Sequence, residues 1–467
     1  MSFSRPPETR LTPATAAPPA ERGPIWFLLV TAVIFGTLLF NLGLAFVNTK
    51  VMGISQNHVV LCELALTGLA LGLAMTRRAG LYTLITLYLA YMLMLMALRA
   101  QLDLKSIRDA LVPIIFYFVG LQIQDIRKVD KLVLWSALAV LAVGMVEFLF
   151  LDLYLANVNI FDYYVARGTI TADTNFLGED NALFHSGVRY GGRNFFGFLG
   201  NHRVSSVFLE PVSMGNFGAF LVLWGVFRKD MHHRFVLIGI AFTLIILCDA
   251  RFGMFVSLLF FLVAPLHRTT PRLLMLLAPV AIVVALMIYA AAANRIGWDD
   301  TLTGRWLYSG QLLMKLDWYG LLGISTKATY LSDSGYAFAL FQTGAVGLMA
   351  LWAIYIYAPM ANDEGWKFKV LLVVYICLLM IVSYSLSTIK TGGLLWLCAG
   401  AVDAWRRGPT SPVSPKMHAS PASSVRDFLT NRWRKRPGNL AQPNAITARR
   451  MPKTSRLLSG RQPRALR

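Results

Sequence analysis

The chain has 467 residues, of which 56% are hydrophobic and 15% charged, and its formal net charge is +20. Soluble domains carry roughly 25% charged residues, so this composition argues against a soluble globular protein. Residues 406–467 hold 15 Lys and Arg and one acid, Asp427, which makes +14 of the +20. No nucleic-acid-binding module accompanies this charge, and we interpret it as a basic tail beside a membrane rather than a nucleic-acid site.

Twelve apolar blocks with almost no charge follow one another along the chain. Helices are the expected way for such blocks of about 20 residues to cross a bilayer, because lipid offers no hydrogen-bond partners. The blocks are continuously apolar and do not alternate, which favours an all-α, polytopic helical bundle. We expect about twelve spans, at 25–47, 59–75, 81–98, 110–124, 132–155, 211–227, 235–250, 252–266, 273–292, 336–359, 370–388 and 391–405.

The Lys and Arg residues of the short loops predict the orientation, since they accumulate on the cytoplasmic side. With the N-terminal tail inside, every short inner loop carries at least two basic residues, as at Arg77 and Arg78. The outer stretch from Arg99 to Asp109 fits this rule poorly, and we expect Asp103 and Asp109 to pair with its basic residues. Both ends of the chain are therefore predicted to be cytoplasmic.

Two long segments separate the blocks, and both fall on the outer face. They contain aromatic residues and glycine, and such aromatics either pack on one another or stack on sugar rings. Two folded caps over the bundle are therefore predicted. The expected organisation is a cytoplasmic tail 1–24, spans 1–5 in 25–156, a first large loop 157–210, spans 6–9 in 211–292, a second large loop 293–335, spans 10–12 in 336–405 and a basic, disordered cytoplasmic tail 406–467.

Charged residues at the ends of apolar blocks are the first candidates for chemistry. Arg203 and Glu210 close the first large loop, and the planar guanidinium of Arg203 suits a phosphate. A simple Arg–Glu pair or a snorkelling Arg stays open as the alternative. Asp249 and Arg251 lie between two apolar blocks, where an Arg is a functional hypothesis by default, the alternative being a hairpin turn closed by an Asp–Arg pair.

Arg305 in the second large loop is a further candidate anion ligand, although a solvated loop Arg is the more ordinary interpretation of it alone. Asp333 and Tyr336 stand where this loop enters the next apolar block. The sequence has no Walker P-loop, no HExxH and no GxSxG, and its four cysteines lie inside apolar blocks without CxxC spacing. Neither a metal nor any other cofactor is expected.

Taken in order, these segments resemble motifs of the O-antigen ligase/polysaccharide polymerase superfamily. Residues 203–211 (RVSSVFLEP) are similar to that family's Arg…Phe-x-Glu-Pro motif before a span, and 249–253 (DARFG) resembles its Ser-Arg-Gly-like turn. Residues 304–324 and 333–348 look like the Gly- and Arg-containing second loop and its end. The resemblance covers about 200–360.

This resemblance implies a periplasmic glycan transfer at a bacterial inner membrane, from undecaprenyl-pyrophosphate-linked oligosaccharide to a sugar hydroxyl. It implies that Arg203 and Arg251 stabilise the charge of the diphosphate leaving group and that Glu210 deprotonates or orients the acceptor hydroxyl. The remaining residues expected to bind substrate are Arg305, Asp249, Asp333 and Tyr336. Membrane lipids and a chain-length regulator (a polysaccharide co-polymerase) are the other partners that it implies.

The branch of the family is indicated by a missing histidine. The ligase branch usually has a His where this chain has Asp333 to Tyr336, and no His occurs between His267 and His418. We therefore expect a repeat-unit polymerase for exopolysaccharide, capsule or O-antigen. An O-antigen ligase and a lipid-linked oligosaccharide flippase stay as alternatives, although a flippase should have short loops and charges lining a cavity at mid-membrane.

Overall fold

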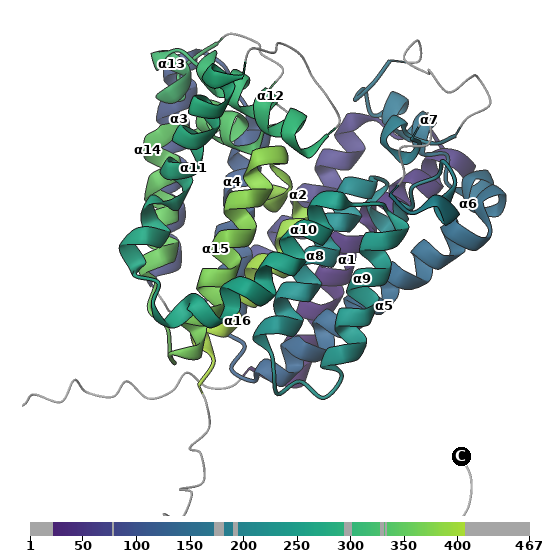
Figure 1. The fold of residues 1–467 in the computed structure, drawn as a ribbon, viewed down its shortest axis with the longest axis horizontal. Coiled ribbons are helices and arrows are strands. Elements are labelled where there is room, and N and C mark those ends of the chain that lie inside the picture. Colours follow the sequence, from purple (N-terminus) through teal and green to yellow (C-terminus); the bar gives the residue numbers. More distant parts are fainter. Residues whose placement is uncertain are drawn as a thin grey trace, which may run out of the picture. The chain divides into compact units, whose positions relative to one another are not determined.

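The computed structural model describes residues 22–76, 79–171, 182–189, 195–293, 301–326, 331 and 334–406. Within these ranges the chain is helical and has no β-strand, apart from an isolated antiparallel bridge between Val188 and His202. The prediction of an all-α fold is thus confirmed for the described part of the chain (Figure 1).

Each predicted span overlaps one long helix of the structure, but the block 132–155 is broken at Phe150 into a long and a short helix, and the blocks 252–266 and 370–388 each run into a separate short 3-10 helix. The twelve helices are α1 (Pro24–Lys50), α2 (Gln56–Ala74), α3 (Ala79–Arg99), α4 (Leu104–Gly120), α5 (Ile126–Leu149), α8 (Pro211–Phe227), α9 (Arg234–Leu247), α10 (Arg251–Val263), α11 (Arg272–Ala292), α14 (Gly335–Tyr357), α15 (Glu364–Val382) and α16 (Ile389–Ala404). The shorter elements are α6 (Leu151–Asn157), α7 (Ile160–Ala166), η2 (His185–Gly187), η3 (Gly197–Leu199), η4 (Ser206–Phe208), η5 (Ala264–Arg268), α12 (Leu302–Met314), α13 (Trp318–Leu321) and η6 (Ser385–Ser387).

Eight helices of the described chain are long and apolar enough to cross a membrane, which indicates a membrane protein. These are α1, α2, α3, α5, α10 together with η5, α11, α14 and α15. The helices α8 and α9 are apolar but shorter, and the 14 residues of α9 rise only about 21 Å, against a hydrocarbon core of about 30 Å. Crossing by α4, α8, α9 and α16 therefore stays a prediction.

Three helices, α4, α5 and α15, begin six residues before the apolar blocks that predicted them, and two of them have a side-chain cap. The blocks at 110–124 and 132–155 correspond to α4 and α5, which start at Leu104 and Ile126. The side chains of Asp103 and Asp125 accept hydrogen bonds from backbone N–H groups in the first turns of these helices, at 3.1 and 3.0 Å. Such caps satisfy groups that would otherwise lack partners, so the helices extend into polar sequence.

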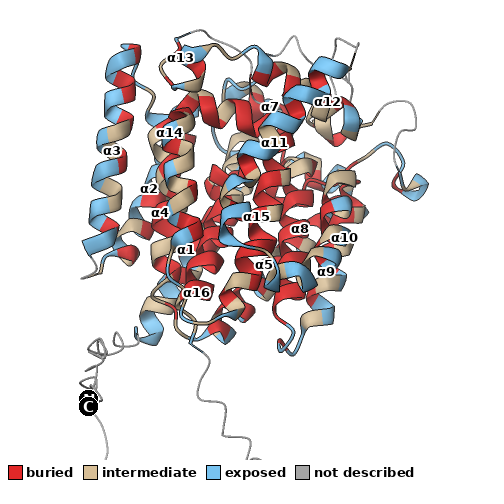
Figure 2. Cartoon of the chain, turned by 60° about the vertical axis from the view of Figure 1, so that its left-hand side comes forward, coloured by how far each residue is buried: buried red, intermediate tan, exposed pale blue. Residues whose placement is uncertain are grey.

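The helices α8 and α15 form the centre of the bundle. In the most apolar part of α15, 83% of the residues are buried, against 22–44% in the other seven long apolar helices. Figure 2 shows buried residues concentrated on α15, α8, α5 and α16, whereas α3 stands at the edge. A Cβ atom on Gly400 would overlap the carbonyl oxygen of Tyr117, so only glycine allows α16 to lie this close to α4.

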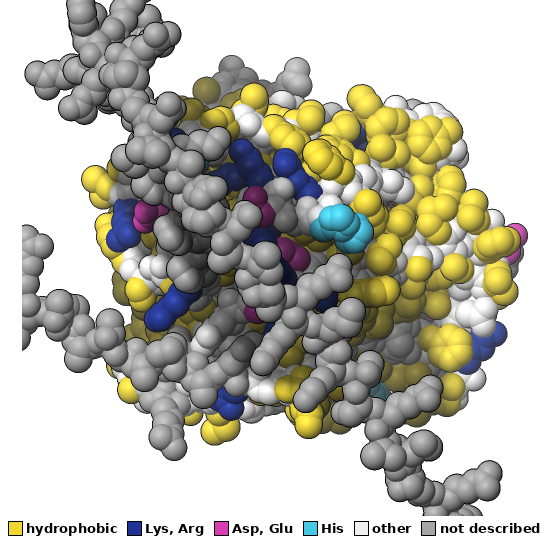
Figure 3. Space-filling view, turned by 90° about the horizontal axis from the view of Figure 1, so that it is seen from below, with side chains coloured by type: hydrophobic (Ala, Val, Ile, Leu, Met, Phe, Trp, Pro, Cys, Tyr) yellow, Lys and Arg dark blue, Asp and Glu magenta, His cyan; other side chains and the backbone are white. Residues whose placement is uncertain are grey.

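The bundle has two ends that differ in what they carry. We call the end that carries α7, α12 and α13 the cap end, and the opposite end, where α16 finishes, the tail end (Figures 1 and 2). Figure 3 shows the tail end, where Lys and Arg side chains gather beside acidic ones and hydrophobic side chains form the rim. The predicted large loops thus contribute α7, α12 and α13 to the cap end, whereas α6 belongs to the block predicted as the fifth span.

The stretch that fits the orientation rule poorly has most of its charges bound inside the fold. Arg108 pairs with Asp109 at 2.7 Å and with Glu63 of α2. Arg99 donates to the carbonyl oxygen of Gln342 in α14 at 2.6 Å. The expected pairing is confirmed for Asp109, while Asp103 caps α4. Of the three basic residues in this stretch, only Arg108 is neutralised by acids, while Arg99 is bound by backbone carbonyl groups and Lys105 is exposed.

Candidate functional site

Glu147, near the end of α5, holds the loop that leads into α8. Its fully buried carboxylate accepts hydrogen bonds from the backbone N–H and hydroxyl of Ser205, at 3.0 and 2.9 Å, and from the backbone N–H of Ser206 at 2.5 Å. His202 Nε2 lies 3.2 Å from Glu147 Oε1. Because buried hydrogen bonds to a carboxylate are strong, Glu147 fixes residues 202–206 against the bundle.

Arg203 lies buried between this loop and the turn that joins α9 to α10. Its Nε donates to the carbonyl of Cys248 and its Nη1 to the carbonyl of Ser186, both at 3.0 Å. The backbone N–H of Arg203 donates to the carbonyl of Gly187 at 2.8 Å. Two of the guanidinium donors therefore join loop segments, and the positive charge of Arg203 is fixed within the cap end.

Asp249 occupies the α9–α10 turn together with Arg251. Its Oδ1 accepts a hydrogen bond from the backbone N–H of Phe195 at 3.0 Å, and its Oδ2 lies 3.1 Å from Nε of Arg189. Asp249 has φ of +46°, in the left-handed region that Asp tolerates better than most residues. Arg251 begins α10, and its backbone N–H lies 3.2 Å from the Asp249 carbonyl oxygen. The turn thus places an acid against Arg189, which the sequence did not single out.

The α9–α10 turn packs directly against α8. A Cβ atom on Gly215 would overlap the side chain of Ala250, and one on Gly253 would clash with the carbonyl oxygen of Gly215. The glycines at 215 and 253 therefore allow α8 to lie in direct contact with the α9–α10 turn and the start of α10. This contact holds the turn beside the first half of α8, the helix that begins directly after Glu210.

Glu210 forms a four-residue cluster with side chains from three elements. Its Oε2 accepts hydrogen bonds from Nζ of Lys390 in α16, at 2.9 Å, and from the hydroxyl of Ser213 at 2.8 Å. Its Oε1 accepts a hydrogen bond from the hydroxyl of Tyr164 in α7, also at 2.9 Å. The cluster joins the first large loop, α8 and the start of α16.

The electrostatics of this cluster keep Glu210 ionised. Burial raises the pKa of its carboxyl, but the nearby ammonium of Lys390 and hydrogen bonds from three side chains outweigh burial and lower that pKa from 4.5 to about 2. Burial and the Glu210 carboxylate raise the pKa of the Tyr164 phenol well above 10. Tyr164 therefore stays a hydrogen-bond donor, and Glu210 stays a carboxylate at neutral pH.

The second group of predicted residues lies on other elements. Arg305 is in the first turn of α12, half-buried, and α12 is tied to the start of α14 by a hydrogen bond between Ser309 and Ser334 at 2.6 Å. Tyr336 is fully buried, and its hydroxyl donates to the carbonyl of Cys377 at 2.9 Å. Tyr336 therefore joins α14 to α15 within the core. Asp333 lies outside the described residues.

The aromatic residues of the two large loops differ in exposure. Tyr163 and Tyr164 are buried, and the rings of Tyr164 and Phe184 lie 4.5 Å apart. On α13, by contrast, Trp318 is 79% and Tyr319 64% exposed. Packing therefore accounts for the tyrosines of the first loop, whereas the aromatics of α13 are free to contact a ligand.

Sequence reasoning overlooked Lys390 and Glu147. Lys390 is a single charge in the short turn between the apolar blocks 370–388 and 391–405, and one basic residue in such a turn does not by itself indicate a site. Glu147 is a single acid inside the block 132–155, and an isolated charge in such a block is itself a signal of function. Both residues act through partners that are distant in sequence, by 180 positions for Lys390 and 58 for Glu147.

The arrangement suits the binding of an anion beside a hydroxyl group. Guanidinium and ammonium groups held by the fold stabilise negative charge without reorganising, and a carboxylate accepts a hydrogen bond from a hydroxyl. Among the described residues, no group of three His, Cys, Asp or Glu side chains could hold a metal ion. The charged side chains gathered around the loop before α8 and the α9–α10 turn are Glu147, Arg189, Arg203, Glu210, Asp249, Arg251 and Lys390.

Comparison with known proteins adds no assignment. No family model, no curated protein and no solved structure matches this chain. Its function is therefore argued from its own residues, and the charged groups at the cap end are the observation on which that argument depends.

Proposed function

We propose that this protein polymerises oligosaccharide repeat units carried on undecaprenyl pyrophosphate, at the periplasmic face of a bacterial inner membrane. One observation carries the proposal: Arg203, the turn with Asp249 and Arg251, and the Glu210–Lys390 pair belong to one connected region of the cap end. The order of the motifs in the sequence, which resembles that of polysaccharide polymerases, supports the same function.

The proposed reaction breaks the bond between the sugar anomeric carbon and the diphosphate oxygen. The acceptor hydroxyl forms the new glycosidic bond, and the diphosphate leaves with the electron pair. Negative charge grows on the diphosphate as it leaves, and the fixed charges of Arg203, Arg251 and Lys390 stabilise it. This leaving group is already activated, so the reaction requires neither a nucleotide nor a metal.

Glu210 is better suited to orienting the acceptor hydroxyl than to deprotonating it. A carboxylate whose pKa is about 2 is a weak base at neutral pH, because a general base works best with a pKa near the working pH. We therefore assign the hydroxyl proton to the departing diphosphate, which is the stronger base, and the hydrogen bond that directs the hydroxyl to Glu210.

The proposal requires twelve spans, with the cap end in the periplasm and both chain ends in the cytoplasm. The Lys and Arg side chains that gather at the tail end support this orientation (Figure 3). Single cysteines at Phe198 on the cap end and Arg127 on the tail end test it, because both side chains are exposed. A membrane-impermeant maleimide should label only the Phe198→Cys protein in intact cells.

The activity is tested by expressing variants in a strain that lacks the chromosomal copy. Arg203→Lys and Arg251→Lys should abolish long polymer while the protein remains in the membrane, because lysine cannot reproduce the planar fork. Arg127→Lys is the matched control, since its exposed side chain lies at the tail end, and it should leave polymer unchanged. Near-normal polymer from both site variants would refute the assignment of these residues.

The size distribution of the glycan separates the alternatives. Loss of a polymerase leaves single repeat units on the outer side, loss of a flippase leaves none there, and loss of an O-antigen ligase leaves polymer that is not attached to lipid A. Only the first pattern in the deletion strain agrees with the proposal.

A further inference from the structure

An apolar groove runs between α3, α4, α14 and α16, away from the charged site at the cap end. Its volume is about 1180 Å³, which exceeds the roughly 300–1,000 Å³ of ordinary small-molecule sites. The described residues that line it are mainly apolar, among them Leu84, Leu87, Ile114, Phe118, Leu351 and Trp396. A groove of this size and character between apolar helices suits hydrocarbon chains.

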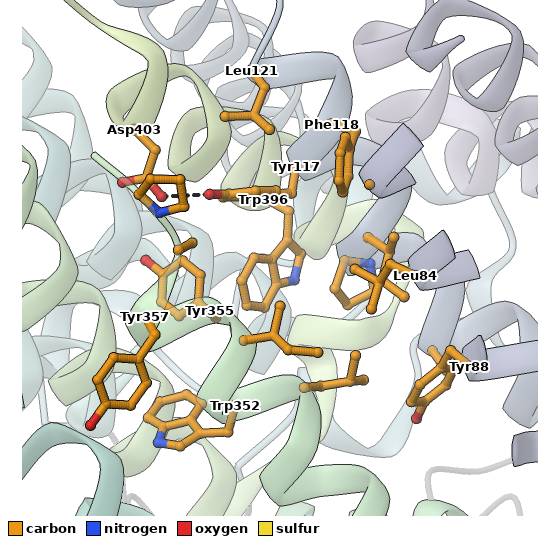
Figure 4. A pocket seen from close by; sticks show the side chains of 18 of the residues that line it. Leu84, Tyr88, Tyr117, Phe118, Leu121, Trp352, Tyr355, Tyr357, Trp396 and Asp403 are labelled. Carbon is orange, nitrogen blue, oxygen red and sulfur yellow. Dashed lines mark hydrogen bonds between the residues drawn. The ribbon is translucent and has the colours of Figure 1, made fainter. Parts of the chain in front are cut away.

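The end of the groove nearest the tail end is polar. Asp403 lies there, and its Oδ2 accepts hydrogen bonds from the hydroxyl of Tyr117 at 2.6 Å and from Nζ of Lys369 at 3.1 Å (Figure 4). The other oxygen, Oδ1, has no hydrogen-bond partner, and neither has the buried hydroxyl of Tyr355. Asp403 and Tyr355 are only 3% and 7% exposed, and both line the groove.

Two buried polar atoms without partners at the polar end of the groove require an explanation. Leaving such atoms unsatisfied is costly, and nearly all of them in folded proteins have a partner. Asp403 Oδ1 is only an acceptor, and the oxygen of the Tyr355 hydroxyl can also accept, so both can take hydrogen bonds from a ligand that donates N–H groups.

The charges at this end of the groove favour a zwitterion. Asp403 is neutralised by Lys369, which is fully buried and does not itself line the groove, and the other charged residues that line the groove, Asp125 and Arg406, balance each other. Pockets that bind anionic headgroups have an excess of positive charge, and this site has none. In a headgroup that carries both charges, the cation can contact Asp403 and the phosphate can contact Arg406.

We propose that the groove binds a phospholipid of the ethanolamine class. Its acyl chains occupy the apolar part, its ammonium donates hydrogen bonds to Asp403 Oδ1 and the Tyr355 hydroxyl, and its phosphate faces Arg406. Asp403 lies 13 residues after Lys390 in α16, which is a rise of about 20 Å. The headgroup contacts are therefore distant from Lys390, although the apolar part of the groove extends along the bundle to Leu386 and Ser387, and the lipid proposal does not depend on the proposed function.

The first experiment compares headgroups on the purified full chain in detergent. Phosphatidylethanolamine, phosphatidylcholine and phosphatidylglycerol with identical acyl chains are added one at a time, and bound lipid is counted by native mass spectrometry. Phosphatidylcholine has no N–H donor, so we expect it to bind at least about fivefold more weakly than phosphatidylethanolamine. Equal binding of all three lipids would overturn the proposal, since it would mean that the groove selects only for acyl chains.

The variant Tyr355→Phe tests the headgroup contact without disturbing the buried ion pair. It should lower the affinity for phosphatidylethanolamine about 2- to 10-fold, the usual range for one hydrogen bond. The lipid-free protein should unfold at the same temperature as the wild type or a higher one, because a partnerless hydroxyl has been removed. A clear loss of stability without lipid would show that the hydroxyl has a partner inside the protein, and the proposal would fail.

Tyr88→Phe is the matched control. The hydroxyl of Tyr88 is also buried and without a partner, and it lines the same groove at a distance from Asp403 (Figure 4). This variant should leave the preference for ethanolamine unchanged, whereas an equal effect of both variants would contradict a headgroup at Asp403. Leu84→Trp, which fills the apolar part, should reduce binding of the specific lipid, and unchanged binding would place that lipid elsewhere.

Competition with undecaprenyl phosphate is the last test. Bound phosphatidylethanolamine should stay on the protein when an equal amount of undecaprenyl phosphate is added. Displacement of phosphatidylethanolamine by the carrier would assign the groove to the substrate chain and overturn the phospholipid proposal, while leaving the proposed transfer reaction intact.

Discussion

Replacing Glu210 by Gln should weaken the contact between the first large loop, α8 and α16. The substitution keeps the size of the side chain but removes the charge that faces the Lys390 ammonium at 2.9 Å. It also leaves the Ser213 and Tyr164 hydroxyls with a poorer acceptor. The variant therefore tests the ion pair with little change in packing.

The expected size of the effect follows from the pKa of Glu210. A fall from 4.5 to about 2 corresponds to at most about 3–4 kcal/mol of interaction favouring the carboxylate, at roughly 1.4 kcal/mol per pKa unit. The Glu210 side chain is 34% exposed, so water screens part of this interaction. We expect Glu210→Gln to lower the free energy of unfolding at pH 7 by about 1–2 kcal/mol.

The assay is a double-mutant cycle on the purified protein in detergent, with Glu210→Gln, Lys390→Met and the double variant. Because the folded pKa lies below 4.5, the stabilisation is complete above that pH and declines as the pH falls towards 2. The coupling energy between the two residues should therefore decrease between pH 5 and pH 3. Lys50→Met at the end of α1 is the control, since its exposed side chain should show no coupling to Glu210.

A coupling energy that is near zero at pH 7 would refute this reasoning. The same holds for a coupling that is unchanged from pH 7 to pH 3, because the Glu210 carboxyl of the unfolded chain, with its pKa of 4.5, becomes protonated in that range and the stabilisation must decline. Either result would mean that Lys390 does not hold Glu210 in its ionised form.

Three further substitutions test other contacts of the structure. Glu147→Gln should cost about 1.5–3 kcal/mol of stability, because Ser205 and Ser206 lose a charged acceptor, and it should speed limited proteolysis between residues 195 and 210. Gly400→Leu should lower the amount of folded protein, because the new Cβ would overlap the backbone of α4 and destabilise the fold by at least about 1–3 kcal/mol. Gly239→Leu is the control and should have no such effect, because no atom lies within 4 Å of a Cβ at Gly239. Equal thermal stability of the two variants would contradict the packing of α16 on α4. Trp318→Ala should shorten the polymer without changing the amount of protein in the membrane. The control is Trp135→Ala, since Trp135 is also exposed (62%) but lies on α5, and this variant should leave polymer length unchanged. Normal polymer from Trp318→Ala would rule out that a sugar stacks on Trp318.

The helices could be predicted because their signals are local. A run of apolar residues and a cap such as Asp103 or Asp125 act within a few positions, so each of the twelve blocks corresponds to a helix. The boundaries of α4 and α5 were predicted less well, because apolar length marks the buried part of a helix and the caps lie beyond it. Helix length indicates a membrane crossing for eight of the twelve helices, whereas α4, α8, α9 and α16 are shorter.

The candidate site was predicted in part. Placing Asp249 and Arg251 together required only their adjacency in the chain, and Glu210 was noticed as a charge beside an apolar block. The partner of Glu210 was not predictable, because Lys390 is 180 positions away and reaches it only when the start of α16 lies beside the start of α8. Burial of Tyr336 in the core was likewise invisible in a single sequence.

The sequence by itself determined the membrane character, the helical class and the charged segments, because hydrophobic length and net charge are properties of short stretches. The tertiary structure alone decided which charges meet. Close approaches such as that of Gly400 to α4 select one packing of the helices, and that packing places Lys390 against Glu210 and Asp403 against Lys369. Helix packing depends on the fit of side chains from distant segments, and no single segment of the chain specifies that fit.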